Sequence, residues 1–315
     1  MVAFSWGDFA YRFRGAVMKF LHMLPHLLGV SFLAMIIGLL LMGLGRQFTA
    51  RIQRRIGPPF YQAYIDVLKC FSKTSITHGF VMDLGSIMSL AGLVATAFYV
   101  PFLQWTPTGS GSLVIILYLM TIGYLGMAMG VSASGNPQAP IGISRALALM
   151  LGYKIPLVMV IMAMILVTGT SDLLNIVGRQ QGGITHWFIW KFPVGFLAVE
   201  IAFQGMIGEK PYDMMIAPAE IASGPMVELS GKYLGLAFLL HAVQLYVETA
   251  LIVNLFLGGA AHPATFFGKQ LLVYLTSMAV NAVMARYRIE QGIAHLWRWA
   301  GTLALVQLVL TKSSL

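Results

Sequence analysis

The chain is poor in charged residues. Asp, Glu, Lys and Arg make up 10% of its 315 residues, whereas apolar residues make up 58%. A soluble domain carries about 25% charged residues, which cover its surface. Apolar runs also recur along the whole length, so the shortage of charge predicts an all-α, polytopic membrane protein.

The chain has a single cysteine, Cys70, which excludes an internal disulfide and a thiolate metal cage. It also lacks a P-loop, a dinucleotide-binding glycine fingerprint, a Ser/His/Asp signature and a Cys-x-x-Cys pair. We therefore expect no catalytic residue, metal or cofactor in this chain. The net charge of +9 does not indicate nucleic-acid binding, because excess Lys and Arg in a membrane protein mostly sets its orientation.

Eight apolar runs approach the length of about 20 residues that a membrane-spanning helix needs. They lie near 26–45, 84–104, 112–131, 146–168, 187–207, 234–257, 266–285 and 297–312, and the last two are the weakest. These runs predict about eight transmembrane helices in a single integral membrane domain, 1–315. Residues 1–25 are expected to form a separate interfacial N-terminal helix.

Basic residues gather in alternate loops. The loops 46–83, 132–145, 208–233 and 285–296, with the start of the last run, hold twelve of the 20 basic residues: Arg46, Arg51, Arg54, Arg55, Lys69, Lys73, Arg145, Lys210, Lys232, Arg286, Arg288 and Arg298. The positive-inside rule places these odd-numbered loops in the cytoplasm and both termini outside.

The first of these loops contains "RRIGPPFYQAYIDVLK", residues 54–69. Gly57 and Pro58 begin a turn that can open a helix, because proline is tolerated in the first helical turn. Apolar and aromatic residues then recur at helical spacing, with Asp66 and Lys69 on the other side, which predicts an amphipathic helix at the membrane surface. The apolar set is Tyr61, Tyr64, Ile65, Leu68 and Phe71. From charge alone, the arginines before the turn favour a topology signal over a docking site for a partner.

Among the polar residues inside apolar runs, Lys154, Glu200, His241 and Glu248 are candidates for a functional role. A charge at the centre of a membrane helix costs about 3 kcal/mol or more, so the lysine and the two glutamates are interpreted as parts of an ion path. Lys154 could instead extend its side chain to the interface. A satisfied core residue is the favoured interpretation of His241.

The loop after the fifth run is long and acidic. It holds Glu209, Asp213, Glu220 and Glu228, four of the chain's eleven acidic residues. Connections of this length are more often functional than not. The alternative is a solvated loop whose acids balance the neighbouring arginines.

The basic loops together resemble those of a known family. The loop motifs occur in the family's order: "RIQRRIGPPFYQAYIDVLK" at 51–69, "GISRALALMLGYKIP" at 142–156, "EKPYDM" at 209–214, "EIASGPMVELSGK" at 220–232 and "ARYRIEQ" at 285–291. They resemble the membrane subunit of complex I that docks the quinone-reducing peripheral arm. The likeness is closest to the M subunit of group 4 energy-converting nickel–iron (NiFe) hydrogenases, or to the related sulfane sulfur reductase complex.

Departures from the complex I pattern favour that second branch. The first loop is shortened to "RRIGPPFYQ", and "GPMVELSG" also resembles the hydrogenase branch. Ile216 and Pro218 stand where complex I relatives commonly have carboxylates, which argues against a working quinone site. Lys154 replaces the glutamate of a Tyr-Glu-x-Pro-like motif, and Met206 replaces another glutamate.

The resemblance implies a membrane anchor and coupling subunit of a respiratory, hydrogenase-like complex in a prokaryotic inner or plasma membrane. It implies partner subunits that carry Fe–S clusters and a NiFe-type centre, namely the peripheral large and small subunits, and antiporter-like membrane subunits alongside. The residues expected to dock partners are Arg51, Arg54, Arg55, Gly57, Pro58, Tyr61, Asp66 and Lys69. Those expected on the coupling or proton path are Asp213, Glu220, Glu228, Glu200, Glu248, Lys154, Arg145 and His241.

Two alternatives stay open. The chain could form the quinone chamber of a complex I-type oxidoreductase, which would predict bound quinone. It could also be a stand-alone transporter, although no internal repeat of the inverted-repeat kind is visible in the sequence.

Overall fold

The computed structural model describes the backbone of residues 6–313 and the side chains of residues 23–313. Throughout that part of the chain the regular secondary structure is helical and contains no strand. The predicted all-α class of polytopic membrane protein is confirmed.

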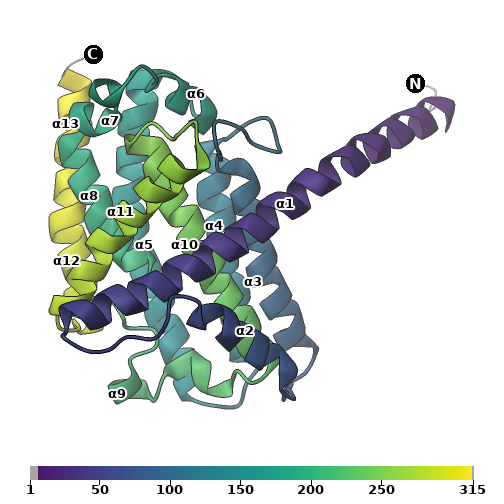
Figure 1. The fold of residues 1–315 in the computed structure, drawn as a ribbon, viewed down its shortest axis with the longest axis vertical. Helices are drawn as coiled ribbons and strands as arrows, with labels where there is room; N and C mark the ends of the chain where they lie inside the picture. Colours follow the sequence, from purple (N-terminus) through teal and green to yellow (C-terminus); the bar gives the residue numbers. More distant parts are fainter. Residues whose placement is uncertain (1–5, 314–315) are drawn as a thin grey trace, which may run out of the picture.

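Most of the helices form a bundle that runs between two ends, whereas the N-terminal helix crosses the bundle obliquely and projects beyond it (Figure 1). The long helices are α1 (Trp6–Ile52), α3 (Phe80–Tyr99), α4 (Leu113–Ser132), α5 (Gln138–Thr168), α10 (Lys232–Phe256) and α11 (Pro263–Val283). Shorter elements are α2 (Gln62–Ser72), α6 (Leu173–Gly178), η1 (Ile184–His186), α7 (Phe188–Lys191), α8 (Pro193–Met206), α9 (Pro218–Ile221) and η2 (Gly224–Glu228). The chain ends with α12 (Ile289–His295), the π-helical segment η3 (Leu296–Gly301) and α13 (Thr302–Ser313).

Helix α10 is the centre of the bundle. Every residue from 242 to 260 is buried, so this helix has no face toward lipid or water along most of its length. It packs against α1, α3, α2 and α11 in particular. A helix that is apolar all round is stable only when its neighbours cover every side. Polar groups on α10 therefore face the protein interior.

Small residues allow α3 and α4 to pack closely. A methyl group at Gly85 would overlap the backbone at Gly130, and one at Gly126 would overlap the backbone at Ser89. Within a membrane, helices associate largely through such close packing, because lipid tails are as apolar as the side chains. This pair forms one wall of the bundle.

Six helices in the described residues are long and apolar enough to cross a membrane. They cover Met23–Ile52, Phe80–Tyr99, Leu113–Ser132, Gln138–Thr168, Lys232–Phe256 and Ile289–Ser313. The other two predicted runs correspond to α8, which has 14 residues, and to α11, which has 21 residues but is not among the six. Large apolar side chains such as Phe32, Val114 and Leu305 are exposed on the outside of these helices, as contact with lipid requires.

The structure corrects two local predictions. No helix ends near residue 25; α1 continues through Pro25, and the side chains before residue 23, which include most of the predicted interfacial helix, lie outside the described residues. The predicted surface helix is present as α2, but Ala63 and Val67 form its buried face, whereas Leu68 and Phe71 are exposed.

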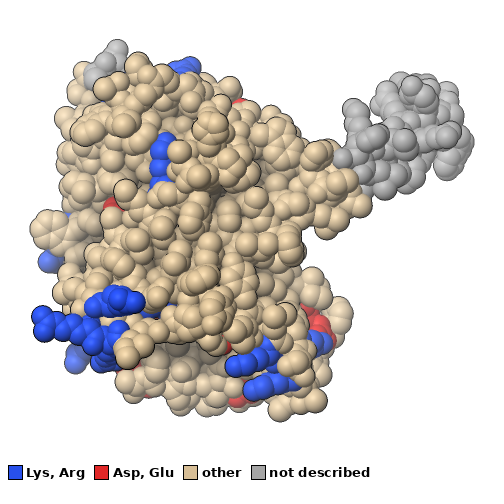
Figure 2. Space-filling model, in the orientation of Figure 1, with Lys and Arg blue, Asp and Glu red and all other residues tan. Residues whose placement is uncertain are grey.

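Basic side chains gather at one end of the molecule, which we call the basic end (Figure 2). It comprises the C-terminal part of α1, α2, the first turns of α3, α5, α10 and α12, and the segment from α9 to η2. Its loops are tied together by ion pairs: Arg145 with Glu220 at 2.7 Å, Lys232 with Asp83 at 3.2 Å and His78 with Glu228 at 3.1 Å. The basic end is therefore a connected surface built from several loops.

Candidate functional site: a polar chamber inside the basic end

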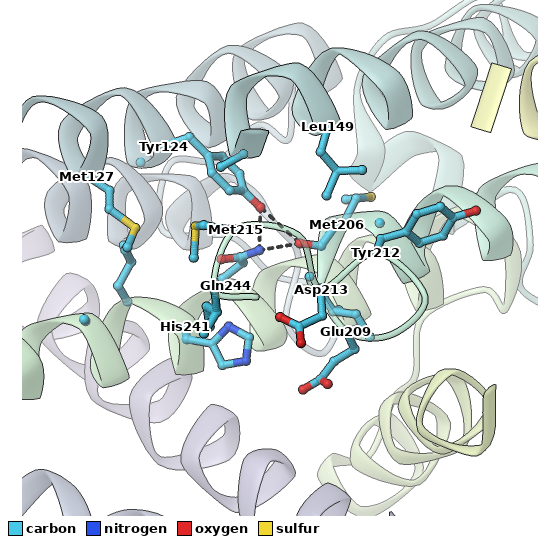
Figure 3. A pocket seen from close by; sticks show the side chains of 18 of the residues that line it. Tyr124, Met127, Leu149, Met206, Glu209, Tyr212, Asp213, Met215, His241 and Gln244 are labelled. Carbon is cyan, nitrogen blue, oxygen red and sulfur yellow. Dashed lines mark hydrogen bonds between the residues drawn. The ribbon is translucent and has the colours of Figure 1, made fainter. Parts of the chain in front are cut away.

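A cavity of about 340 Å³ lies inside the basic end (Figure 3). Its walls come from α1, α4, α5, α8, α10 and α11 and from the loop after α8. We call it the chamber. Most of its lining is apolar and rich in methionine, and its polar lining residues are Arg46, Tyr124, Tyr153, Glu209, Tyr212, Asp213, His241, Gln244 and Tyr274. An apolar pocket with a few convergent polar groups is the usual form of a functional site.

The loop after α8 brings two carboxyl groups to the chamber wall. Burial, with a smaller contribution from the neighbouring Asp213 carboxylate, raises the pKa of Glu209 to about 7, and the charges of Lys210 and Arg46 oppose that shift. Burial also raises the pKa of Asp213, against the effect of its ion pair with Arg286. The pKa of Glu209 thus lies near neutral pH, where a carboxyl group can bind or release a proton.

A hydrogen-bonded group leads from the chamber toward the middle of the bundle. His241, Gln244 and Glu248 follow one another on the same face of α10, one turn apart. The Gln244 amide donates to the Tyr124 hydroxyl at 2.5 Å, to the Met206 carbonyl at 2.7 Å and to Glu248 Oε1 at 3.0 Å. Figure 3 shows the first two of these contacts at the chamber wall. The chamber is thus connected to a fully buried carboxyl group.

Lys154 lies beyond this group, on the neighbouring helix α5. Its ammonium donates to the Thr121 hydroxyl and to the Leu117 carbonyl of α4, the latter at 3.4 Å. It also lies near enough to Glu248 for the two charges to attract each other. The second oxygen of Glu248 has no hydrogen-bond partner among the described residues. Lys154 is therefore directed into the bundle and is not extended to the interface.

The other predicted coupling residues lie apart from this row. Glu220 and Arg145 form an ion pair on the outside of the basic end, and Glu228 is held by His78 and by the Asn136 amide at 3.0 Å. Glu200 lies between α8 and α11, where the Thr276 hydroxyl donates to it at 2.6 Å. Asp213 and His241 are the predicted residues that line the chamber itself.

The predicted docking residues divide into two groups. Arg51, Arg54, Arg55, Tyr61 and Lys69 are exposed at the basic end. The remaining three hold the loop in place. Gly57 lies against Ala50 and Gln47 of α1, with Pro58 beside it, and Asp66 accepts from Gln62 at 2.8 Å and pairs with Arg46 at 3.0 Å.

Sequence reasoning gave no role to several chamber residues. Tyr124 and Gln244 are neutral, and neutral polar residues within an apolar run carry no charge signal. Gln244 could have been found from its spacing, three residues after His241 on the same helical face. Glu209 and Arg46 were noted only as loop charges, and their convergence depends on the path of the loop after α8.

The fold and chamber define a polytopic helical membrane protein with a cavity inside its basic end, lined by apolar residues and a few polar ones. Among the described residues, no group of three or more His, Cys, Asp or Glu side chains could hold a metal ion. The particular family follows from comparison with known proteins.

Residues 26–312 match the NADH dehydrogenase family. The chain is 30% identical over 310 residues to the H subunit of NADH-quinone oxidoreductase from Dehalococcoides mccartyi strain CBDB1, covering 92% of this chain and 86% of that protein. The same protein from strain ATCC BAA-2266 / KCTC 15142 / 195 is 29% identical over 309 residues, covering 92% of this chain and 86% of that protein. The chain belongs to the NADH dehydrogenase family and is a homologue of these H subunits.

A solved structure is similar over nearly the whole fold. A chain in the structure of the membrane-bound sulfane sulfur reductase, an archaeal respiratory membrane complex, superposes with a TM-score of 0.82 at 36% identity. The match covers 93% of this chain and 99% of that chain. The resemblance predicted from the loop motifs is confirmed at the level of the family and of this complex.

Proposed function

We propose that this chain is the membrane subunit of a multi-subunit respiratory complex, in which it anchors a peripheral redox arm and couples electron transfer to H⁺ or Na⁺ translocation. The observation that carries the proposal is the chamber directly inside the basic end, whose wall includes the carboxyl groups of Glu209 and Asp213. The similarity to the H subunit of NADH-quinone oxidoreductase and to a chain of the sulfane sulfur reductase complex supports it. In this proposal the basic end faces the cytoplasm and both termini face outward.

The outer surface of the basic end has the composition of a docking site. Exposed basic residues stand beside exposed large apolar residues, which a soluble partner would cover. We call this the docking surface; it comprises Arg51, Arg54, Arg55, Ile56, Phe60, Tyr61, Leu68, Lys69 and Phe71. Arginine and aromatic residues are enriched at protein interfaces, and exposed apolar patches commonly mark them.

The docking proposal is tested by reversing one charge. Arg54→Glu is expected to release the peripheral arm from solubilised membranes, as measured by the subunits that co-purify with this chain. Arg179→Glu is the matched control, because Arg179 is exposed in the connection after α6, away from the docking surface. Retention of the arm with normal activity in the Arg54 variant would refute the assignment.

Coupling is proposed to run from Glu209 and Asp213 through His241, Gln244 and Glu248 to Lys154. Movement of the loop after α8 on reduction of the docked arm would change the surroundings of the two chamber carboxyl groups. A change of charge there would then alter the electrostatic potential at Glu248 and Lys154, because electrostatic interactions are strong where water is excluded. Glu220, Glu228 and Arg145 would act on the same loop through their ion pairs at its edges.

The remaining parts of the proposal concern partner chains. The arm would consist of hydrogenase-like large and small subunits carrying the Fe–S clusters and a NiFe-type centre, and antiporter-like subunits would lie alongside in the bilayer. Identification of the co-purifying proteins tests this directly. A large subunit with four metal-binding cysteines would assign the hydrogenase branch, and a relative lacking some of them would exclude it.

A second candidate function is a quinone chamber. The observation in its favour is the cavity itself. Its volume of about 340 Å³ is that of a small-molecule site, and its lining is mostly apolar and contains tyrosines. The relatives named as subunits of NADH-quinone oxidoreductase also favour it. Extraction of quinone from the purified complex, with inhibition by quinone-site inhibitors, would support this candidate, and absence of both would remove it.

A further inference from the structure

Three contacts join one wall of the chamber to the C-terminal part of the chain. The wall segment is 209–214, which carries Glu209. The backbone N–H of Tyr287 donates to the Pro211 carbonyl at 3.0 Å, and Arg286 pairs with Asp213. In the third contact, the Tyr212 hydroxyl and His295 Nδ1 lie 2.7 Å apart. The position of Glu209 therefore depends on residues that are more than 70 positions away in the sequence.

The Tyr212–His295 contact links the chamber to an irregular helix. The Tyr212 ring lines the chamber, and its hydroxyl points away from the cavity (Figure 3). His295 is the last residue of α12, directly before the π-helical segment η3. Segments of π-helix inside α-helices are frequent at functional sites. The contact thus joins the chamber wall to the residue that directly precedes the π-helical turn.

The surroundings fix both partners. The Tyr287 ring packs on the imidazole of His295 with centroids 5.3 Å apart and on the Tyr212 ring at 6.1 Å. Leu296, the first residue of η3, is fully buried beside Gly152 of α5 and Gly205 of α8. Burial raises the pKa of the Tyr212 hydroxyl, which keeps it protonated and able to donate. A neutral imidazole accepts at Nδ1 when its other nitrogen carries the proton.

We propose that Tyr212 and His295 are positioning residues, whose hydrogen bond holds the wall segment against α12 and so keeps the Glu209 carboxyl in the chamber. The positioning itself is a property of this chain. Its consequence for ion translocation rests on the function proposed above. Tyr212→Phe removes the hydroxyl and keeps the ring, so it tests the bond without creating a large cavity.

The first experiment measures opening of the wall segment without any activity assay. In the purified complex, Cys70→Ser removes the native thiol and Met215→Cys places a reporter at the chamber wall. The rate of alkylation by N-ethylmaleimide then reports local opening. Tyr212→Phe and His295→Leu are each expected to raise the rate about five-fold, which corresponds to about 1 kcal/mol for one hydrogen bond. The double variant should be no faster than either single variant, because the two share one bond.

Two controls separate positioning from a general loss of structure. Tyr287→Phe removes a hydroxyl from the same aromatic cluster and keeps the ring that packs on Tyr212 and His295, so the rate should stay at the parent value. His295→Asn places an acceptor close to the position of Nδ1 and should restore slow alkylation. A parent-like rate in Tyr212→Phe, or an equal rise in Tyr287→Phe, would overturn the proposal.

The second experiment measures the number of ions moved per electron in proteoliposomes. We expect Tyr212→Phe to lower this ratio and His295→Asn to retain it. If alkylation follows the pattern above and the ratio does not change, the positioning role stands and the proposed coupling function fails. If alkylation does not follow the pattern, the positioning role fails whatever the ratio.

Discussion

Arg46 joins the surface helix to the chamber. Its guanidinium lies 3.0 Å from the Asp66 carboxylate of α2, and the same residue lines the chamber, where its charge lowers the pKa of Glu209. One side chain therefore contacts both the helix that supports the docking surface and the cavity that contains the titrating carboxyl. A displacement of α2 by a docked partner would change the position of that charge relative to Glu209.

The raised pKa of Glu209 predicts how stability depends on pH. Its pKa is about 7 in the folded protein and about 4.5 in an unfolded chain, so between these values the folded state binds more protons. Stability attributable to this group is therefore present below pH 4.5 and is lost as the pH rises through 7. The resulting decrease in the free energy of unfolding is about 3 kcal/mol at most, and hydration of this half-buried side chain makes it smaller.

Glu209→Gln should remove that dependence, because the amide resembles the neutral acid. We expect the thermal midpoint of the wild-type chain to fall more between pH 5 and pH 8 than that of the variant, as measured by thermal unfolding in detergent. Glu290→Gln is the control, since Glu290 is exposed at the start of α12 and should behave as wild type. Parallel curves for wild type and Glu209→Gln would contradict the assignment.

Removal of the Arg46 charge should raise the pH at which Glu209 titrates. The charge favours the ionised form of Glu209, so Arg46→Gln is expected to shift the midpoint of the pH dependence to higher pH. Asp66→Asn is the matched control, because it breaks the same ion pair and leaves the arginine in place. The pair is partly exposed and is worth about 1 kcal/mol or less, so both variants should fold. An equal upward shift in the two variants would assign the effect to movement of α2.

The class of fold and the family could be predicted from the sequence, but the chamber could not. Apolar runs predict long helices because each crosses the bilayer independently of the others, and charged residues such as Lys154 and Glu248 stand out within them. Tyr212 and His295 could not be paired, because their contact depends on how the loop after α8 meets α12. The buried face of α2 was misassigned because the pattern shows which residues are apolar and not which neighbour they meet.

Lys154 and Glu248 should show thermodynamic coupling. Each lies inside the bundle, and removal of one deprives the other of an opposite charge that attracts it. Such a loss costs about 3–5 kcal/mol for a fully buried pair, and less here because Lys154 is only partly buried. We expect Lys154→Met and Glu248→Gln each to lower the thermal midpoint, and the double variant to lower it by less than the sum. Additive shifts would show that the two groups do not interact as an ion pair.

The close approach of α3 and α4 gives a prediction that is independent of any activity. A methyl group at Gly126 would overlap the backbone at Ser89, and backbone cannot move aside as a flexible side chain can. Overpacking of this kind costs about 1–3 kcal/mol, so Gly126→Ala should lower the thermal midpoint of the purified chain in detergent. Gly29→Ala is the matched control: Gly29 also lies inside a helix, α1, but an added methyl there meets no atom within 4 Å. Because alanine favours helix over glycine by about 1 kcal/mol, this control should hold or slightly raise the midpoint. A fall of equal size in both variants would show that the α3–α4 contact is not the cause of the loss.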